Sequence, residues 1–139
     1  MMVMKGWVII GIFVMFLWGI GSFFGKIALF KDTPYRVYLF EGMGTLVVLA
    51  VFVLLKRGDI FTDFHINYPA LLMGLSWGVG TVLFILALDS VRLSVFVPLT
   101  ALYPAVTVLL SVAFLKEELE LREAVGVFLA IISVLMLSR

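Results

Sequence analysis

The chain has 139 residues, of which 64% are hydrophobic and only 14% are charged, and its mean hydropathy is +1.24. Soluble domains are about 45–50% apolar and about 25% charged, so this composition excludes a free-standing water-soluble globule and predicts a chain surrounded by lipid. The net charge of +1 excludes an electrostatic nucleic-acid surface. The absence of cysteine excludes disulfides and thiolate sites, and the single histidine excludes a two-histidine zinc motif, so we expect no metal and no cofactor.

Long apolar runs predict five transmembrane helices, since each crossing needs about 20 mostly apolar residues and the alternation of a membrane β-barrel is missing. The predicted spans cover about residues 8–30, 35–55, 68–88, 95–115 and 124–137. The last run gives only about 21 Å of helix against a hydrocarbon core of roughly 30 Å. We expect its flanking Glu123 and Arg139 to reach outward, or the bilayer to thin there. The sequence therefore predicts an all-α integral membrane protein with one five-span domain over residues 1–139.

The basic residues give no preferred orientation in the membrane. Five spans place the termini on opposite sides, and each side then carries five basic residues: Lys5, Lys56, Arg57, Lys116 and Arg122 on one, and Lys26, Lys31, Arg36, Arg92 and Arg139 on the other. The positive-inside rule then has no bias to act on, and this permits a chain that inserts both ways and pairs with an inverted copy of itself, the arrangement that the resemblance described below favours. The alternative is that a weak bias or an outside factor sets one orientation.

Several segments carry a resemblance to a known family when they are taken in order. They are Leu17-Trp18-Gly19 and Lys26-Ile27-Ala28-Leu29 in the first span, Ala87-Leu88 at the end of the third, Ala101-Leu102-Tyr103-Pro104-Ala105-Val106 in the fourth, then Lys116-Glu117-Glu118-Leu119 and Gly126-Val127-Phe128-Leu129-Ala130-Ile131-Ile132. This order resembles the EamA domain of the drug/metabolite transporter superfamily. One departure is Glu41, because the family often has arginine seven positions after the proline that corresponds to Pro34.

The resemblance implies a function as well as a fold. Most EamA proteins fuse two five-span domains, the second inverted relative to the first, whereas this chain has one. It is similar to the short single-repeat type, which implies an antiparallel homodimer of ten helices in the cell membrane that moves a small organic metabolite by alternating access, with a site near the midplane. The alternative function is that of a non-transporting accessory or assembly subunit. With one histidine outside the spans and no pair of intramembrane carboxylates, we do not expect an enzyme.

Two charges inside the predicted spans are candidates for substrate binding or coupling. Glu41 lies about 9 Å into the second span and Lys26 about 6 Å from the end of the first, on the same side. Intramembrane charges are costly and rarely face lipid. The pair could join the two helices, Glu41 could face a cavity and bind a proton or a cationic solute, or both side chains could reach up to the interface.

Aromatic residues and prolines complete the list of site candidates. Trp18, Trp77 and Tyr103 lie deep in the first, third and fourth spans, where their polar groups need partners or a wet cavity. They are expected to line a cavity or to pack in the core, and the remaining alternative is that they face lipid. Pro98 and Pro104 are predicted to bend the fourth span, either to expose carbonyl groups to a solute or only for packing.

Two pairs of glycines have the spacing that lets transmembrane helices approach closely. They are Gly21 with Gly25 in the first span and Gly74 with Gly78 in the third. Helices in lipid associate without a hydrophobic force, so small residues at this spacing favour close backbone contact. We predict that these glycines lie at helix–helix packing surfaces.

Overall fold

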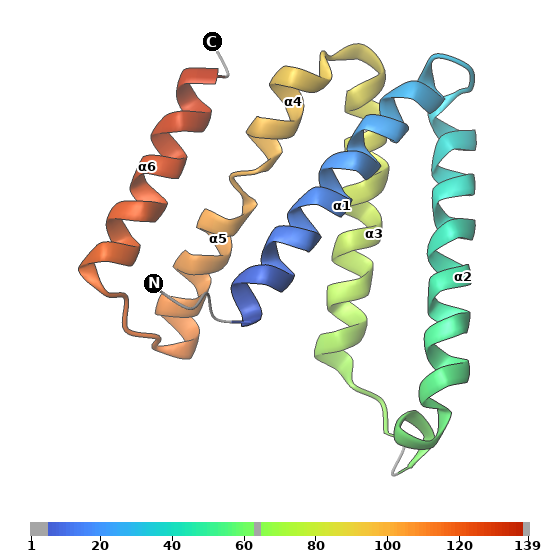
Figure 1. Ribbon diagram of the computed structural model, residues 1–139, viewed down its shortest axis with the longest axis horizontal. Coiled ribbons are helices and arrows are strands. Elements are labelled where there is room, and N and C mark those ends of the chain that lie inside the picture. Colours follow the sequence, from blue (N-terminus) through green and yellow to red (C-terminus); the bar gives the residue numbers. More distant parts are fainter. Residues whose placement is uncertain (1–5, 63–64, 138–139) are drawn as a thin grey trace. The chain divides into compact units, whose positions relative to one another are not determined.

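The computed structural model describes residues 6–62 and 65–137, and all regular structure in them is helical (Figure 1). In chain order the helices are α1 (Gly6–Leu29), α2 (Pro34–Phe61), α3 (Tyr68–Ser90), α4 (Leu93–Thr100), α5 (Tyr103–Leu110), the π-helical turn η1 (Ser111–Leu115) and α6 (Leu121–Leu137). The chain divides into two compact units, Met1–Ser90 and Val91–Arg139. The first unit contains α1 to α3, and the second contains α4 to α6.

Four helical segments are long and apolar enough to cross a membrane: Gly6–Leu29, Pro34–Phe61, Tyr68–Ser90 and Leu93–Leu115. This confirms the prediction of an all-helical, multi-pass membrane protein. Helix α6 has 17 residues, or about 25 Å of helix, which is shorter than the hydrocarbon core. The fifth span therefore stays a prediction, as does the single five-span domain, of which residues 1–5, 63–64 and 138–139 lie outside the described part.

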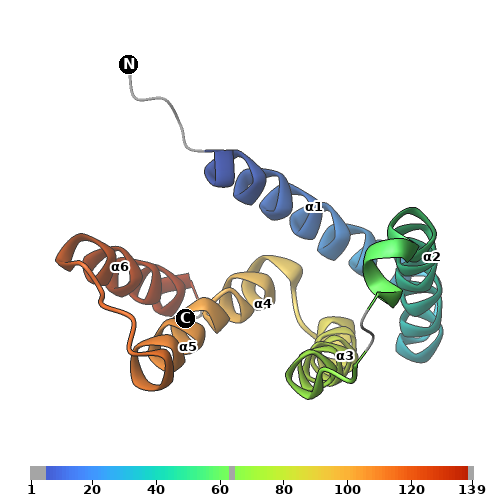
Figure 2. The same cartoon turned by 90° about the horizontal axis from the view of Figure 1, so that it is seen from below.

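In the first unit, α1 and α3 run in the same direction, and α2, which follows α1 and precedes α3 in the chain, runs in the opposite direction (Figure 1). Figure 2 shows α1 inclined to α2 and α3. The α1–α2 turn ends at Thr33, and Pro34 begins α2, where the missing proline N–H costs no helical hydrogen bond. Arg36 Nη1 donates to Asp32 Oδ1 at 3.1 Å and holds this turn against the first turn of α2.

The packed centre of the first unit is small. Val37, Ile85 and Leu88 are buried, and Leu88 is fully inaccessible. No residue of α1 is buried in the single chain, and large apolar side chains along all three helices are exposed. In water this surface would be unstable, but in lipid it needs no cover because hydrocarbon tails are as apolar as the side chains.

Helix α2 is longer than the sequence predicted. The predicted span ends at residue 55, where the charged residues begin, whereas the helix continues to Phe61. Lys56 has non-helical angles (φ −118°, ψ 18°), so the helix is kinked at the first charged residue after the predicted span. The kink lies 22 residues after Pro34, or about 33 Å along the helix.

In the second unit, the predicted fourth span is interrupted rather than continuous. Helix α4 ends at Thr100 and α5 begins at Tyr103, with Pro98 inside α4 and Pro104 in the first turn of α5. Neither proline has an N–H to donate to the preceding turn, so the helix cannot run on unchanged. The last turn, η1, widens to a π-helix and ends at Lys116, whose left-handed backbone (φ 55°) stops the helix. Helix α6 contacts α4 and buries Val134.

Candidate functional site

Glu41 lies on the side of α2 that faces the other helices of the first unit. At about 100° per residue, it is about 40° around the helix from Val37 and about 60° from Tyr38. Val37 is buried, and Tyr38 places its hydroxyl oxygen 3.9 Å from the position that a Cβ on Gly78 of α3 would take. Glu41 remains exposed in the single chain, and its Oε1 accepts a hydrogen bond from Thr45 Oγ1 at 3.2 Å.

Two further hydroxyl side chains lie at the depth of Glu41 in the membrane-spanning part of the unit, and a third lies one turn deeper. Leu29, Pro34 and Asp89 line one pocket, so they mark a common end of α1, α2 and α3. Measured along each helix from that end, Ser22, Glu41 and Thr81 lie at about 10–12 Å and Thr45 at about 16 Å. We call Ser22, Glu41, Thr45 and Thr81 the polar layer. Within this layer Glu41 is the only ionisable side chain.

The two tryptophans predicted from the sequence contact each other at about the depth of Thr45, one turn deeper than Ser22 and Thr81. The ring centroids of Trp18 and Trp77 are 5.5 Å apart, with an angle of 55° between the planes, which is a favourable tilted arrangement. Ser22 Oγ donates to the carbonyl oxygen of Trp18, and Thr81 Oγ1 to that of Trp77, both at 2.9 Å. Each hydroxyl therefore lies one turn beyond a tryptophan, on the faces through which α1 and α3 meet.

Lys26 is bound to α3. Its Nζ donates to the main-chain carbonyl oxygen of Leu88 at 2.6 Å and lies 5.9 Å from the centroid of the Phe30 ring. In the part of the chain that the structure describes, no ion pair joins Lys26 to Glu41. A cation at the C-terminal end of a helix is favourable because the last carbonyl groups carry a partial negative charge. Lys26 thus joins α1 to the end of α3 by a charged hydrogen bond.

This hydrogen bond predicts a difference between two lysines. A Lys26→Met variant is expected to lose about 1 kcal/mol of folding free energy, in the range measured for interhelical hydrogen bonds in membranes. The matched control is Lys56→Met, since Lys56 pairs with Asp59 at 3.5 Å on an exposed surface where an ion pair contributes little. Unfolding of the purified protein in mixed micelles of increasing SDS content measures both variants. Equal stability of the two would contradict a clamping role for Lys26.

The two glycines of each predicted pair have different surroundings. A Cβ on Gly25 would lie 3.9 Å from Cδ2 of the buried Leu88, and Gly78 is approached by Tyr38 as described above. At Gly21 and Gly74 a Cβ would meet no atom within 4 Å in the described part of the chain. One glycine of each pair therefore lies at a contact between helices of the first unit, and the other faces open space.

The remaining candidates belong to the second unit. Tyr103 is exposed in the first turn of α5, and Thr107 Oγ1 donates to its carbonyl oxygen at 3.3 Å. Pro98 and Pro104 flank the interruption between α4 and α5. The structure therefore brings Trp18, Trp77, Glu41 and Lys26 into one unit, whereas Tyr103 and the prolines form part of the other.

Sequence reasoning missed the hydroxyl groups that accompany the named residues. Ser22 and Thr81 follow Trp18 and Trp77 at the same four-residue spacing, a repeated pattern that was visible in the sequence. Residues four apart lie on one face of a helix, so this spacing could have placed the hydroxyls beside the aromatic rings.

Comparison with known proteins gives the family. A model of the EamA-like transporter family matches residues 5–139, which is nearly the whole chain. The chain belongs to this family. The resemblance inferred from the sequence is thereby confirmed, and the EamA-like chain is a multi-pass membrane protein of a transporter family rather than of an enzyme family.

A relative supports the same assignment. The EamA-like chain is 35% identical over 132 residues to an uncharacterised protein of Methanocaldococcus jannaschii, and the match covers 94% of this chain and 95% of the relative. The two proteins therefore share a similar length as well as sequence. No solved structure matches the chain.

Proposed function

We propose that the chain is one half of a secondary transporter or exporter, which acts as an antiparallel homodimer of ten helices and moves a small organic metabolite across the cell membrane by alternating access. The proposal rests on the ionisable side chain of Glu41 within a membrane-spanning helix, between Val37 and Tyr38 around α2, together with membership of a transporter family. An intramembrane ionisable residue is by default a candidate for a substrate or ion pathway.

The single repeat supports a dimer. Transporters built from inverted repeats place their binding site near the bilayer midplane, between two repeats of opposite orientation. A second copy of this chain is the simplest source of the missing repeat, and the equal numbers of basic residues on the two sides permit both orientations. The exposed apolar faces of α1 to α3 leave ample surface for contact with that copy.

The fifth span of the proposed domain is α6. Its 17 residues begin beside Arg122 and Glu123, and its described part after Glu123 carries no further charge. A helix that is a few ångströms too short is accommodated by local thinning of the bilayer or by charged flanks that reach the interface. With α6 in the membrane, both units contribute to a single five-span domain over residues 1–139.

The polar layer is the proposed site for substrate or coupling ion. Glu41 supplies the charge, Thr45 holds its carboxylate, and Ser22 and Thr81 offer hydroxyl oxygens at the same depth. Trp18 and Trp77 form an aromatic floor about 16–18 Å from the common helix end, close to the middle of a hydrocarbon core of roughly 30 Å. A carboxylate above an aromatic floor suits a proton or a cationic group on a partly apolar solute. In the second unit, Tyr103 is a further candidate for binding the solute, and Pro98 and Pro104 flank the interruption of the helix there.

Cysteine labelling tests the antiparallel arrangement, because the native chain has no cysteine. Thr33→Cys and Gly58→Cys lie at opposite ends of α2, about 37 Å apart along the helix, and therefore on opposite sides of the membrane. Treatment of intact cells with an impermeant thiol reagent is expected to label about half of each variant, and purified protein is expected to have the mass of two 15.5 kDa chains.

Detergent-permeabilised cells provide the control, since both variants should then label completely. Full labelling of one variant and none of the other in intact cells would exclude the inverted homodimer. A parallel oligomer or a different partner chain would then have to supply the second repeat.

A further inference from the structure

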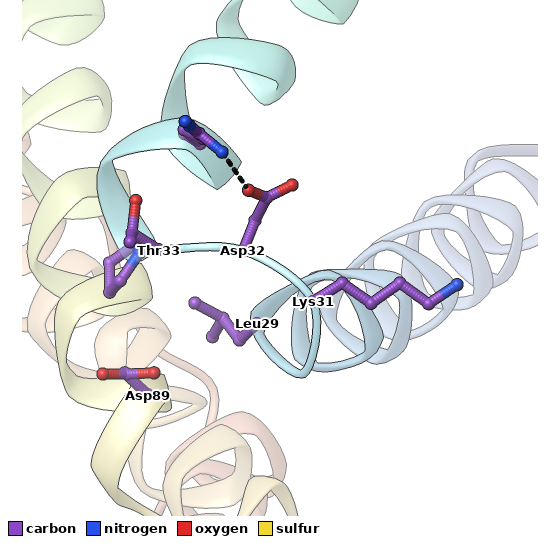
Figure 3. A pocket seen from close by; sticks show the side chains of 7 residues that line it. Leu29, Lys31, Asp32, Thr33 and Asp89 are labelled. Carbon is purple, nitrogen blue, oxygen red and sulfur yellow. Dashed lines mark hydrogen bonds and ion pairs between the residues drawn. The ribbon is translucent and has the colours of Figure 1, made fainter.

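An open pocket of about 430 Å³ lies at the common end of α1, α2 and α3, away from the polar layer. It is formed by the last turn of α1, the α1–α2 turn, the first turn of α2 and the end of α3 (Figure 3). In a helix bundle that crosses a membrane, helix ends lie at the boundary between hydrocarbon and water. The pocket is therefore placed at the level of the lipid headgroups.

The charges of the pocket are of both signs. Arg36 uses Nη1 to donate to Asp32, and its side chain remains 70% exposed, so further guanidinium N–H groups are available to a ligand. Asp89 lies across the pocket, beyond the side chain of Leu29, and within the described residues its carboxylate takes part in no ion pair (Figure 3). Lys31 contributes to the wall, but its side chain is directed away (Figure 3).

Asp89 is in an electrostatic position that attracts a cation. It lies in the last turn of α3, where the carbonyl groups already carry a partial negative charge, so a carboxylate there is unfavourable by itself. Lys26 satisfies the carbonyl oxygen of Leu88, the preceding residue, but the carboxylate of Asp89 still faces the pocket. A ligand with an ammonium group would relieve this repulsion.

We infer that the pocket binds the headgroup of a membrane lipid that carries both a phosphate and a primary ammonium. The phosphate is matched by the exposed guanidinium of Arg36, which binds oxyanions through paired N–H groups. The ammonium is matched by Asp89, and Leu29 gives the pocket an apolar wall. An anionic headgroup without an amine would leave Asp89 opposite a phosphate, so the zwitterion is favoured over it.

The test uses the full chain, purified and titrated with lipids of identical acyl chains by native mass spectrometry. Phosphatidylethanolamine is expected to bind about tenfold more tightly than either phosphatidylcholine or phosphatidylglycerol. The methylated ammonium of phosphatidylcholine cannot donate hydrogen bonds, and phosphatidylglycerol has no ammonium group. Asp89→Asn should lower the affinity for phosphatidylethanolamine to that for phosphatidylcholine. Arg36→Gln should weaken the binding of both. The control is Asp59→Asn, which removes an exposed carboxylate at the other end of α2 and should change nothing.

Two results would overturn the inference. Equal binding of the three lipids to the native chain would show that the pocket does not distinguish their headgroups. This measurement uses only the native chain and does not depend on the folding of a variant. Displacement of the lipid by soluble phosphoethanolamine at micromolar concentration would assign the pocket to a water-soluble ligand rather than to a lipid. Neither result depends on whether the chain transports a solute.

Discussion

A Glu41→Gln chain is expected to insert and dimerise normally but to lose about 10–100-fold of its transport rate. Glutamine keeps the shape of the side chain and can still accept the hydrogen bond from Thr45, so the fold should be preserved. The lost charge removes a charge-assisted contact of about 1.5–3 kcal/mol to the proton or cationic solute. A thermal-stability screen of amine metabolites first identifies a solute that stabilises the native protein. Uptake of that solute into proteoliposomes then measures the transport rate.

Glu117→Gln is the matched control for this experiment. Glu117 is an exposed carboxylate between η1 and α6, outside every helix, and its replacement should leave uptake unchanged. Uptake by the Glu41→Gln chain at the native rate would remove this residue from coupling and substrate recognition. If no solute is taken up even by the native dimer, the accessory-subunit function becomes the better account.

A Leu88→Ala substitution is expected to have the largest effect on stability. Leu88 is fully buried at the point where α1 and α3 meet, beside Gly25 and below the hydrogen bond from Lys26. In a water-soluble protein, such a substitution removes the free energy of transferring the side chain out of water and also its packing contacts. In lipid, only the packing is lost, so we expect about 1–3 kcal/mol of destabilisation, measured by unfolding in SDS-containing micelles.

Leu83→Ala distinguishes packing from a general loss of apolar surface. Leu83 lies on the same helix with 61% of its surface exposed, where lipid can fill the space of the missing atoms. Its replacement should be nearly neutral. Equal destabilisation by both substitutions would mean that the two positions are buried alike, for example by a partner chain that covers Leu83.

The positions of the first and third helices were predictable because their ends coincide with changes in hydropathy. The predicted spans 8–30 and 68–88 differ from α1 and α3 by at most two residues at each end. The end of α2 and the start of α6 were less accurate. Lys56 and Glu123 mark the edges of apolar runs, but lysine, arginine and glutamate are good helix formers, so the helices extend past these charges.

The interruption of the fourth span and the contacts of the site residues could not be predicted from the sequence. Pro98 and Pro104 predicted a bend, but not that the helix stops between Thr100 and Tyr103 or that it ends in a π-helical turn. Trp18 and Trp77 were identified separately, because their contact depends on how α1 and α3 align. The partner of Lys26 is a main-chain carbonyl, which has no residue signature, so a side chain such as Glu41 was the natural guess.

The position of the kink in α2 matches the length of this helix to the thickness of the bilayer. The straight part of the helix, from Pro34 to the kink at Lys56, is about 33 Å long, close to the hydrocarbon thickness of a typical bilayer. The change in direction thus coincides with the first charged residues after the apolar run, and Arg57 and Asp59 beyond it are exposed. In a thicker bilayer these charges would lie within the hydrocarbon, and in a thinner one apolar turns of the helix would be exposed to water. Helix α2 therefore favours membranes of one thickness.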